Sequence, residues 1–381
     1  MRVDVKPELL RWVRERAGMD IDALIGRFPR YAEWEGGAVK PTLKQLESLA
    51  RAVHAPVGYF FLSEPLDEPI PIPDFRTVGS VSLRRPSPDL LDTVYLCQQR
   101  QDWYRGFARM EGEDRLAFVG SARVVSDVET VAADIRAALR FDLEERRALP
   151  SWTDALRRFI DQADALGILV MVSGVVRNNT HRKLDPGEFR GFALVDDLAP
   201  LVFVNGADTK AAQMFTLAHE LAHLWLGESA LSDASPDSLP PQAVEAWCNR
   251  VAAELLVPLA VLREDYRRGE DLTDALTRLA RRFKVSTLVI LRRIHDAGGL
   301  TREQFRQAYD TESERLRAIP GGGGGGDFYR TQTARVGKRF ARAIVASTLE
   351  GGTSFTESLR LLGVGKMRTF NELASRLELV P

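Results

Sequence analysis

The chain has 381 residues, of which 45% are hydrophobic and 28% charged, as in a globular protein with room for two or three domains. Its formal net charge of -1 gives no overall basic surface for nucleic acid, so any DNA contact needs a local patch. The two cysteines, Cys97 and Cys248, exclude a disulfide framework. Residues 1–7 hold no apolar signal core, and the longest apolar run, near residues 166–176, is about half of a membrane span. We therefore expect a cytoplasmic protein.

The N-terminal residues, 1–65, are predicted to form a small helical unit. Leu9, Leu10 and Val13 share one face of a first helix. A second stretch with helical spacing of apolar residues covers positions 42–53 and follows directly after a proline.

A proline-rich stretch comes next, with prolines at positions 65, 69, 71 and 73. Such a stretch is extended and stiff, which predicts a linker. Beyond it, helix-like apolar spacing recurs over residues 90–104 and 128–139. We therefore assign residues 66–150 to a linker followed by a helical region.

A central domain is predicted over residues 151–300. It contains three short apolar segments that predict strands, at residues 168–176, 189–195 and 201–204. A helix is then expected to begin at the N-cap Asp208 and to end at Gly227. After a loop rich in Ser, Asp and Pro, a second helix is expected over residues 242–257. Residues 272–299 predict a helix-turn-helix-like pair with a serine N-cap.

The C-terminal region, residues 301–381, is predicted to be helical. It contains an uninterrupted glycine run at residues 321–326, which lacks the Lys and Ser/Thr of a phosphate loop. We expect this run to act as a flexible hinge, with two or three helices after it. Together the segments predict an α+β chain that is mainly helical, with a small β-sheet in its central domain and helical regions on either side.

The segment 216–225 contains the candidate metal-binding and catalytic residues, because it has the motif His-Glu-x-x-His within a predicted helix. A helix turns about 100° per residue, so His219 and His223 lie one above the other and can direct two imidazoles at one point. Glu220 lies beside them, close enough to act on a water molecule there. This pattern is typical of a zinc-dependent peptidase.

A tetrahedral zinc ion held by two imidazoles needs a third protein ligand. Glu245 and Glu254 on the next helix are nine residues apart, or about 180° around the helix axis, so only one of them can face the metal. We favour Glu245, with Asn249 one turn later as a hydrogen-bonding neighbour, and Cys248 remains an alternative ligand. The expected cofactor is one Zn²⁺ per chain, although the ligand types also suit Mn or Fe.

The chemistry that follows is peptide hydrolysis, with Glu220 taking a proton from water and delivering it to the leaving amine. His181 and Tyr266 are candidates for stabilising the oxyanion, although a structural role for His181 is the simpler interpretation. Residues 202–205 are either a strand edge that binds substrate or a core strand.

The sequence at this point resembles the ImmA/IrrE family of metallo-endopeptidases. The resemblance is carried by residues 188–194, 199–205, 215–223 and 245–258, and the family places its glutamate ligand at the position of Glu245. It implies a compact zincin-like fold and a regulatory protease. Its expected partner is a helix-turn-helix repressor, cleaved in response to stress, phage or DNA damage, so that transcription of silenced genes begins.

Residues 9–62 resemble a second element, the XRE-type helix-turn-helix unit that is fused to one branch of the family. The residues that match are Trp34, Glu35, Gly37, Pro41, Thr42, Gln45, Leu46 and Ala50. Between Leu24 and Glu35 the chain is a few residues shorter than usual, and Pro29 falls where the recognition helix belongs. This helix should be cut short or lost. Both DNA binding and a protein-interaction or structural role stay open for the unit.

Two further partners follow from weaker signals. The extended branch with a C-terminal helical region resembles antitoxin-type regulators, which implies a neighbouring toxin and a peptidase fold used as a binding module. Residues 263–306 hold eleven Lys/Arg and seven Asp/Glu, and four basic residues between positions 335 and 342 share one helical stripe. These groups are either solvated helix faces with ion pairs or a surface for DNA that regulates the protease.

Overall fold

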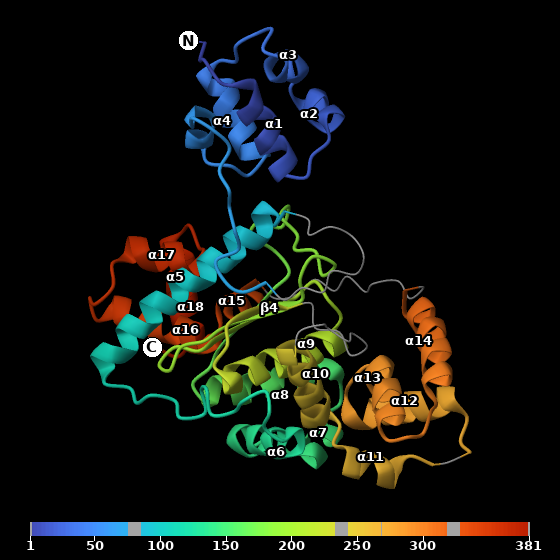
Figure 1. Ribbon diagram of the computed structural model, residues 1–381. Coiled ribbons are helices and arrows are strands. Elements are labelled where there is room, and N and C mark those ends of the chain that lie inside the picture. The colour runs from blue at the N-terminus through green and yellow to red at the C-terminus, as the bar shows by residue number, and fades with distance from the viewer. Residues whose placement is uncertain (1, 75–84, 233–242, 268, 318–327, 380–381) are drawn as a thin grey trace. The chain divides into compact units, whose positions relative to one another are not determined.

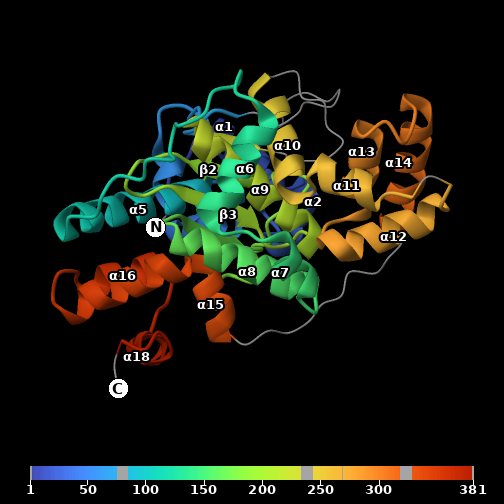
Figure 2. The same ribbon diagram turned by 90° about the horizontal axis from the view of Figure 1, so that it is seen from below.

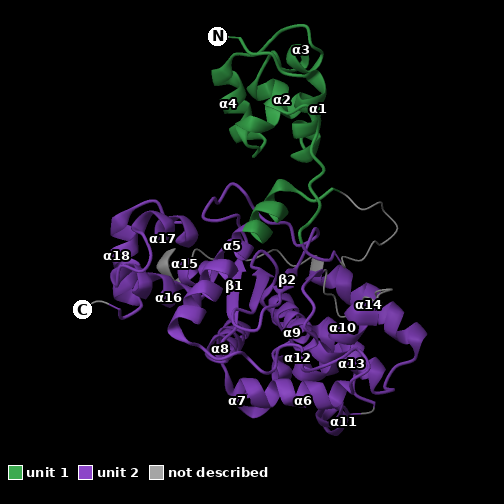
Figure 3. Cartoon of the chain, turned by 60° about the vertical axis from the view of Figure 1, so that its left-hand side comes forward, with its two compact units in different colours: residues 1–71, 78–95 green, residues 72–77, 96–381 purple. Residues whose placement is uncertain are grey.

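The computed structural model describes residues 2–74, 85–232, 243–267, 269–317 and 328–379. It is mainly helical with one small mixed sheet, which confirms the predicted α+β class. The chain divides into two compact units, one of residues 1–71 and 78–95 and the other of residues 72–77 and 96–381 (Figure 3). Among the described residues, no helix combines the length and apolar character needed to cross a membrane.

The N-terminal unit consists of short helices around an apolar core. Its elements are α1 (Pro7–Arg16), α2 (Ile21–Arg27), α3 (Tyr31–Glu35), α4 (Leu43–Ala52) and the 3-10 helix η1 (Val57–Phe61). The helix predicted over residues 42–53 is confirmed as α4. It begins with a capping box, in which the Thr42 side chain accepts from the Gln45 N–H and the Gln45 side chain accepts from the Thr42 N–H.

Between Leu24 and Glu35, where the sequence predicts a shortened or missing helix, the structure has the helix α3 of only five residues. Its long side chains point inward, because Tyr31, Trp34 and Glu35 are all buried. The Glu35 carboxylate accepts two hydrogen bonds of 3.0 Å from the Arg14 guanidinium on α1. The short helix agrees with the predicted shortening, and most of the larger side chains of α3 pack inward rather than outward.

The second unit contains the sheet and most of the helices. The helix α5 (Pro88–Glu111) enters it at residue 96. The elements before the motif helix are α6 (Val128–Leu139), α7 (Leu143–Ala148), α8 (Trp152–Ala165), β1 (Leu169–Ser173), β2 (Gly191–Leu194) and β3 (Leu201–Asn205). The elements from the motif helix onward are α9 (Lys210–Leu226), β4 (Ala230–Ser232), α10 (Ala243–Leu256), α11 (Leu259–Asp265), α12 (Leu272–Phe283), α13 (Thr287–Asp296), α14 (Arg302–Arg317), α15 (Phe328–Val336), α16 (Lys338–Leu349), α17 (Phe355–Leu362) and α18 (Met367–Arg376).

The sheet has the strand order β1-β3-β2-β4, with β1 parallel to β3 and with β2 antiparallel to both β3 and β4. The three predicted strands are confirmed. The sequence missed β4, which lies in the segment predicted to be a loop. Three residues are too few to show an alternating pattern, so β4 is defined only by its pairing with β2.

Different helices cover the two faces of this sheet (Figure 1). Val170, Ala193 and Val202 lie in the larger core with α8, α9 and α10. On the other face the Phe192 and Phe203 rings stack, with centroids 5.0 Å apart. Figure 2 shows α12–α14 and α15–α18 at opposite ends of the unit. The motif helix is thus held between the sheet and α10.

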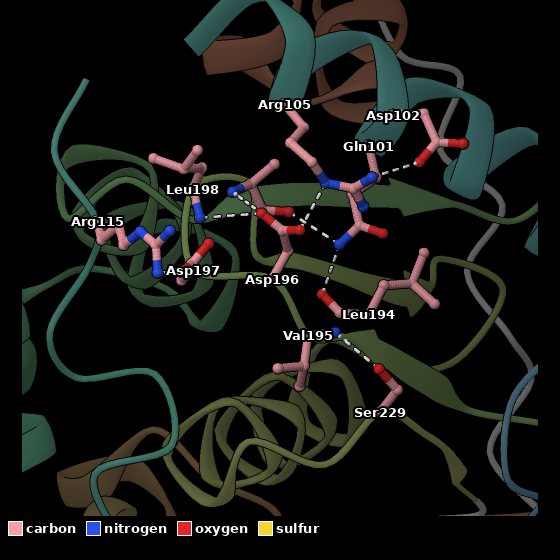
Figure 4. A network of polar contacts seen from close by, with 11 residues as sticks. Gln101, Asp102, Arg105, Arg115, Leu194, Val195, Asp196, Asp197, Leu198 and Ser229 are labelled. Carbon is pink, nitrogen blue, oxygen red and sulfur yellow. Dashed lines mark hydrogen bonds and ion pairs between the residues drawn. The ribbon is translucent and has the colours of Figure 1, made fainter. Parts of the chain in front are cut away.

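A polar network ties α5 to the turn between β2 and β3 (Figure 4). The Gln101 amide donates 2.9 Å hydrogen bonds to the carbonyls of Leu194 and Ala199, the residues that flank the turn. The Asp196 carboxylate pairs with Arg105 at 2.6 Å. Beside it, the Val195 N–H donates to the Ser229 hydroxyl, which fixes the chain one residue before β4. The turn and the start of β4 are therefore positioned together.

The C-terminal helices pack on β1. The buried Arg100 guanidinium donates to the Leu361 carbonyl at 2.9 Å and to the Arg335 carbonyl at 3.3 Å. Gly337, between α15 and α16, approaches β1 so closely that an added Cβ would lie 2.9 Å from the Val170 carbonyl oxygen. Four helices follow residue 327 in the described part of the chain, rather than the two or three expected, because glycines divide the segment more often. The glycine run itself, residues 321–326, lies outside the described residues.

Asp164 at the end of α8 is a buried carboxyl whose pKa is raised to about 7, chiefly by burial. Asp161 raises this pKa further, while a hydrogen bond from the Val170 N–H and the charges of Lys338 and Arg339 lower it. Since the folded state binds this proton more tightly than the unfolded chain does, the contribution of Asp164 to stability falls as the pH rises from about 4 to 7.

We expect Asp164→Asn to gain stability relative to wild type between pH 5 and pH 8, by about 2–3 kcal/mol. Urea unfolding at the two pH values measures this difference. Asp134→Asn, at an exposed position on α6, serves as the control and should show little change. A pH dependence that is identical in wild type and Asp164→Asn would contradict the assignment.

Candidate metal centre

The motif helix α9 begins and ends at identifiable residues. Its N-cap is Thr209, whose side chain accepts from the Ala212 N–H at 3.2 Å. The predicted cap, Asp208, is therefore wrong by one residue. Its carboxylate accepts from the Thr209 N–H instead, outside the helix. The predicted end at Gly227 is confirmed, because this glycine adopts a left-handed conformation with φ 75°.

Residues 213–225 of α9 are buried, including His219, Glu220 and His223. The two imidazoles lie one turn apart, with their Nε2 atoms 3.1 Å from each other. The sequence spacing therefore produces the convergence of nitrogen atoms that it predicts.

The helix α10 packs beside α9 and brings Glu245 to the same point (Figure 1). The Glu245 carboxylate oxygens lie 3.2 Å from His219 Nε2 and 3.0 Å from His223 Nε2. Among the described residues these three side chains form the cluster whose ligand atoms all lie within 4.8 Å of one another.

The other acid of α10 points elsewhere. Glu254 forms a buried ion pair with Arg293 of α13, and its carboxylate accepts from the Leu259 N–H at 3.3 Å. The half-turn separation of the two acids on α10 therefore holds in three dimensions, with Glu245 facing α9.

Burial governs the ionisation of the site. It raises the pKa of Glu220 well above its usual value, and the Glu245 charge raises it further, while an interaction with Ser232 lowers it. Burial also raises the pKa of Glu245, but His219 and His223 outweigh it and hold this pKa at about 2. Burial lowers the pKa of His223 and outweighs the opposing effect of Glu245, which favours the neutral imidazole. A neutral imidazole is the form that binds a metal ion.

The donor set fits a divalent metal. Two imidazole nitrogens and a carboxylate oxygen are the ligands of many catalytic zinc sites, and such sites leave a fourth position open. A buried carboxylate is costly unless it is paired, and the ion pairs of Glu245 in the described structure are those with the two imidazoles. A cation at this point would compensate for both buried acids.

The remaining candidate residues lie away from this cluster or beside it. His181 is exposed in a turn, where its N–H donates to the Asn179 side chain at 3.0 Å. Tyr266 is half-buried at the end of α11. Asn249 is buried one turn after Glu245, so its predicted role beside the metal stays open. Cys248 is buried, which raises the pKa of its thiol and disfavours the thiolate that binds metals.

The segment 202–205, which was predicted to be either an edge or a core strand, is the core strand. It belongs to β3, which lies between β1 and β2 in the middle of the sheet.

Two residues near Glu220 were not singled out from the sequence. Gly191 at the start of β2 faces α9, and Ser232 of β4 is paired with it. A Cβ at position 191 would lie 2.5 Å from Thr216 Cγ2 and 2.9 Å from Glu220 Oε1. The only sequence signal was a glycine inside a predicted strand, which indicates a close approach without naming the neighbour.

Comparison with known proteins agrees with this geometry. Residues 163–295 match the family described as the IrrE N-terminal-like domain (Peptidase M78), which covers the sheet, α9, α10 and the helices up to α13. The chain is also similar to the radiation response metalloprotease IrrE of Deinococcus radiodurans, with 36% identity over 91 residues. That match covers 23% of this chain and 28% of the relative.

Residues 163–295, which contain the sheet and the helices α9 and α10, are therefore similar to the IrrE N-terminal-like domain of the ImmA/IrrE metallopeptidases. Residues 336–376, which include α16, α17 and α18, match a family described only as a domain of unknown function (DUF8813).

We expect Gly191→Ala to destabilise the protein by about 1–3 kcal/mol, because the new methyl group overlaps Thr216 and the Phe203 carbonyl as well as Glu220. Urea unfolding measures the loss. Gly106→Ala in α5 is the matched control, because a Cβ there meets no atom within 4 Å. Equal stability of the two variants would show that β2 lies further from α9 than described.

Proposed function

We propose that this protein is a zinc-dependent endopeptidase that cleaves a regulatory protein. The observation that supports it most is the meeting of His219, His223 and Glu245 at one buried point, with Glu220 beside them on α9. Zinc held by these three side chains would supply the Lewis acidity that peptide hydrolysis requires. The same donors would accept Mn or Fe, so the identity of the metal is part of the proposal.

The protein's own residues have distinct roles in this reaction. Glu220 accepts the proton of the attacking water at its carboxylate and delivers it to the nitrogen of the scissile amide, which leaves as an amine. Gly191 leaves the space that this carboxylate occupies. The apolar core around α9 excludes bulk water, which strengthens the electrostatic interactions of the site. Asn249 and His181 remain candidates for orienting a ligand and for stabilising the oxyanion.

For the substrate we propose a helix-turn-helix repressor, cleaved in response to stress, phage or DNA damage. The resemblance to the ImmA/IrrE family suggests such a partner, and the relative in Deinococcus is named for a radiation response. The short, inward-packed α3 favours a protein-interaction or structural role for the N-terminal unit over DNA reading.

Several residues of the two basic groups, for which ion-paired helix faces and a DNA surface were the alternatives, have partners within the chain. Arg278, Arg282 and Arg292 each form an ion pair with an acid at 2.5–3.0 Å. In the tail, Arg335 donates to the Asn178 side chain and Arg339 pairs with Glu113, so both hold α15 and α16 to the rest of the unit. These contacts favour structural roles over phosphate binding.

Metal analysis and a cleavage assay test the proposed function together. We expect about one zinc per chain in wild type and in Glu220→Gln, and a large loss of metal in His223→Ala and Glu245→Ala. Co-expressed with a repressor encoded beside it, wild type should cleave the repressor. Glu220→Gln should be slower by about 10²-fold or more, because it lacks the general base.

The control separates the proposal from the alternative, an antitoxin that uses the peptidase fold as a binding module. If wild type and Glu220→Gln both leave every repressor intact, yet both neutralise a neighbouring toxin, the binding module is the function and the endopeptidase proposal fails.

A further inference from the structure

The two outer strands of the sheet differ in their relation to the site. The edge of β1 is covered where α15 meets α16, at the close contact of Gly337 with the Val170 carbonyl. The other outer strand, β4, runs beside the catalytic carboxylate. Its Ser232 is paired with Gly191, and position 191 lies against Glu220. A peptide that paired with the outer edge of β4 would therefore lie near Glu220, because only β4 and β2 would separate it from this carboxylate.

The chain itself already uses this edge. The Leu231 N–H of β4 donates to the Pro73 carbonyl at 2.9 Å, and Asp74 and Leu231 form a parallel bridge. The side chains of this connector alternate as they do in a strand, because Ile72 and Asp74 are half-buried whereas Pro73 is exposed. The proline-rich segment that the sequence predicted to be a linker thus ends as a short strand on the sheet.

We propose that the outer edge of β4 is the docking site for an extended segment of the protein substrate, and that Pro73 and Asp74 occupy this edge as a displaceable strand of the chain itself. The proposal rests on the endopeptidase function proposed above. It makes the connector an internal competitor, which a substrate must replace before its peptide bond can reach Glu220.

Proline makes the connector a weak occupant. In a parallel bridge centred on Asp74, the residue before it turns both of its main-chain groups toward β4. Pro73 offers its carbonyl but has no N–H, and Pro71, two residues earlier, has none either. Among the described residues, the pairing of the connector with β4 is a single bridge. It persists because the connector is covalently attached, which gives it a high local concentration at β4.

The chemistry of the edge defines the substrate that can displace the connector. An added strand binds through hydrogen bonds of its main chain, so the edge of β4 would bind an extended segment rather than an intact helix. A segment without proline at the positions that face β4 makes more hydrogen bonds than the connector does. In a helical partner such as a repressor, the cleaved bond should therefore lie in a linker or a locally unfolded stretch.

The test compares two glycine variants of the full chain. Ile72→Gly/Asp74→Gly removes the two half-buried side chains of the docked segment and makes it more flexible, while it keeps Pro73. Leu66→Gly/Asp67→Gly is the matched control, because it replaces one apolar residue and one Asp at exposed positions earlier in the same connector.

We expect the amide of Leu231 to exchange with solvent at least about fivefold faster in the first variant than in wild type or in the control, as measured by mass spectrometry. A synthetic peptide of residues 66–74 should restore its protection, and a scrambled peptide should not. With a cleavable substrate, KM should fall about three- to tenfold with kcat nearly unchanged, because only the competition for the edge is relieved.

Different failures have different meanings. Equal Leu231 exchange and equal KM in all three proteins would overturn the edge assignment while the endopeptidase function stands. Proteins that cleave nothing, yet show the expected exchange differences, would refute the endopeptidase function and the substrate role of the edge. That outcome would still support Pro73 and Asp74 as a displaceable strand.

Discussion

The second unit depends on one constraint, that two imidazoles and two carboxylates meet at one buried point between α9 and α10. Glu220 and Glu245 are both buried, and an isolated buried charge is costly by several kcal/mol. The pairing of Glu245 with His219 and His223 offsets part of this cost, and a divalent cation would offset more. The site exists only if α9 and α10 pack at a fixed distance, since the ligands come from both helices.

The surrounding structure enforces this packing. Above α9, the glycine at the start of β2 lets the sheet approach closely enough to touch Glu220. On the far face of the sheet, α5 fixes the turn after β2 through Gln101 and Arg105. The buried Arg100 extends the same scaffold to the C-terminal helices. The segment that matches a family of unknown function is therefore packed into the same unit as the metal centre.

The two outer strands of the sheet, β1 and β4, are covered to different extents, and this difference bears on the proposed function. The unpaired N–H and C=O groups of an edge strand can pair with any extended peptide. Both outer strands of a four-stranded sheet therefore need to be covered or otherwise protected. Here helices cover β1, whereas in the described part of the chain a proline-rich segment pairs with β4 through a single bridge. The more extensive cover lies away from Glu220, and the weaker one lies on the strand beside it. This asymmetry fits the docking of one extended segment that we propose for β4.

The sequence by itself determined what depends on local periodicity. The four-residue spacing of His219 and His223 fixes their common face, and the nine residues between Glu245 and Glu254 place the two acids on opposite faces. Helices with clear apolar stripes and caps, such as α4, α9, α12 and α13, were predicted for the same reason.

Tertiary structure alone decided features that depend on residues far apart in the chain. These include the pairing of β4 with β2 and with Asp74, the central place of β3, the approach of Gly191 to Glu220, and the acid partners of Arg278 and Arg282. Strand pairing and close contact leave no periodic pattern in three residues or in a single glycine, so packing between distant segments has to define them.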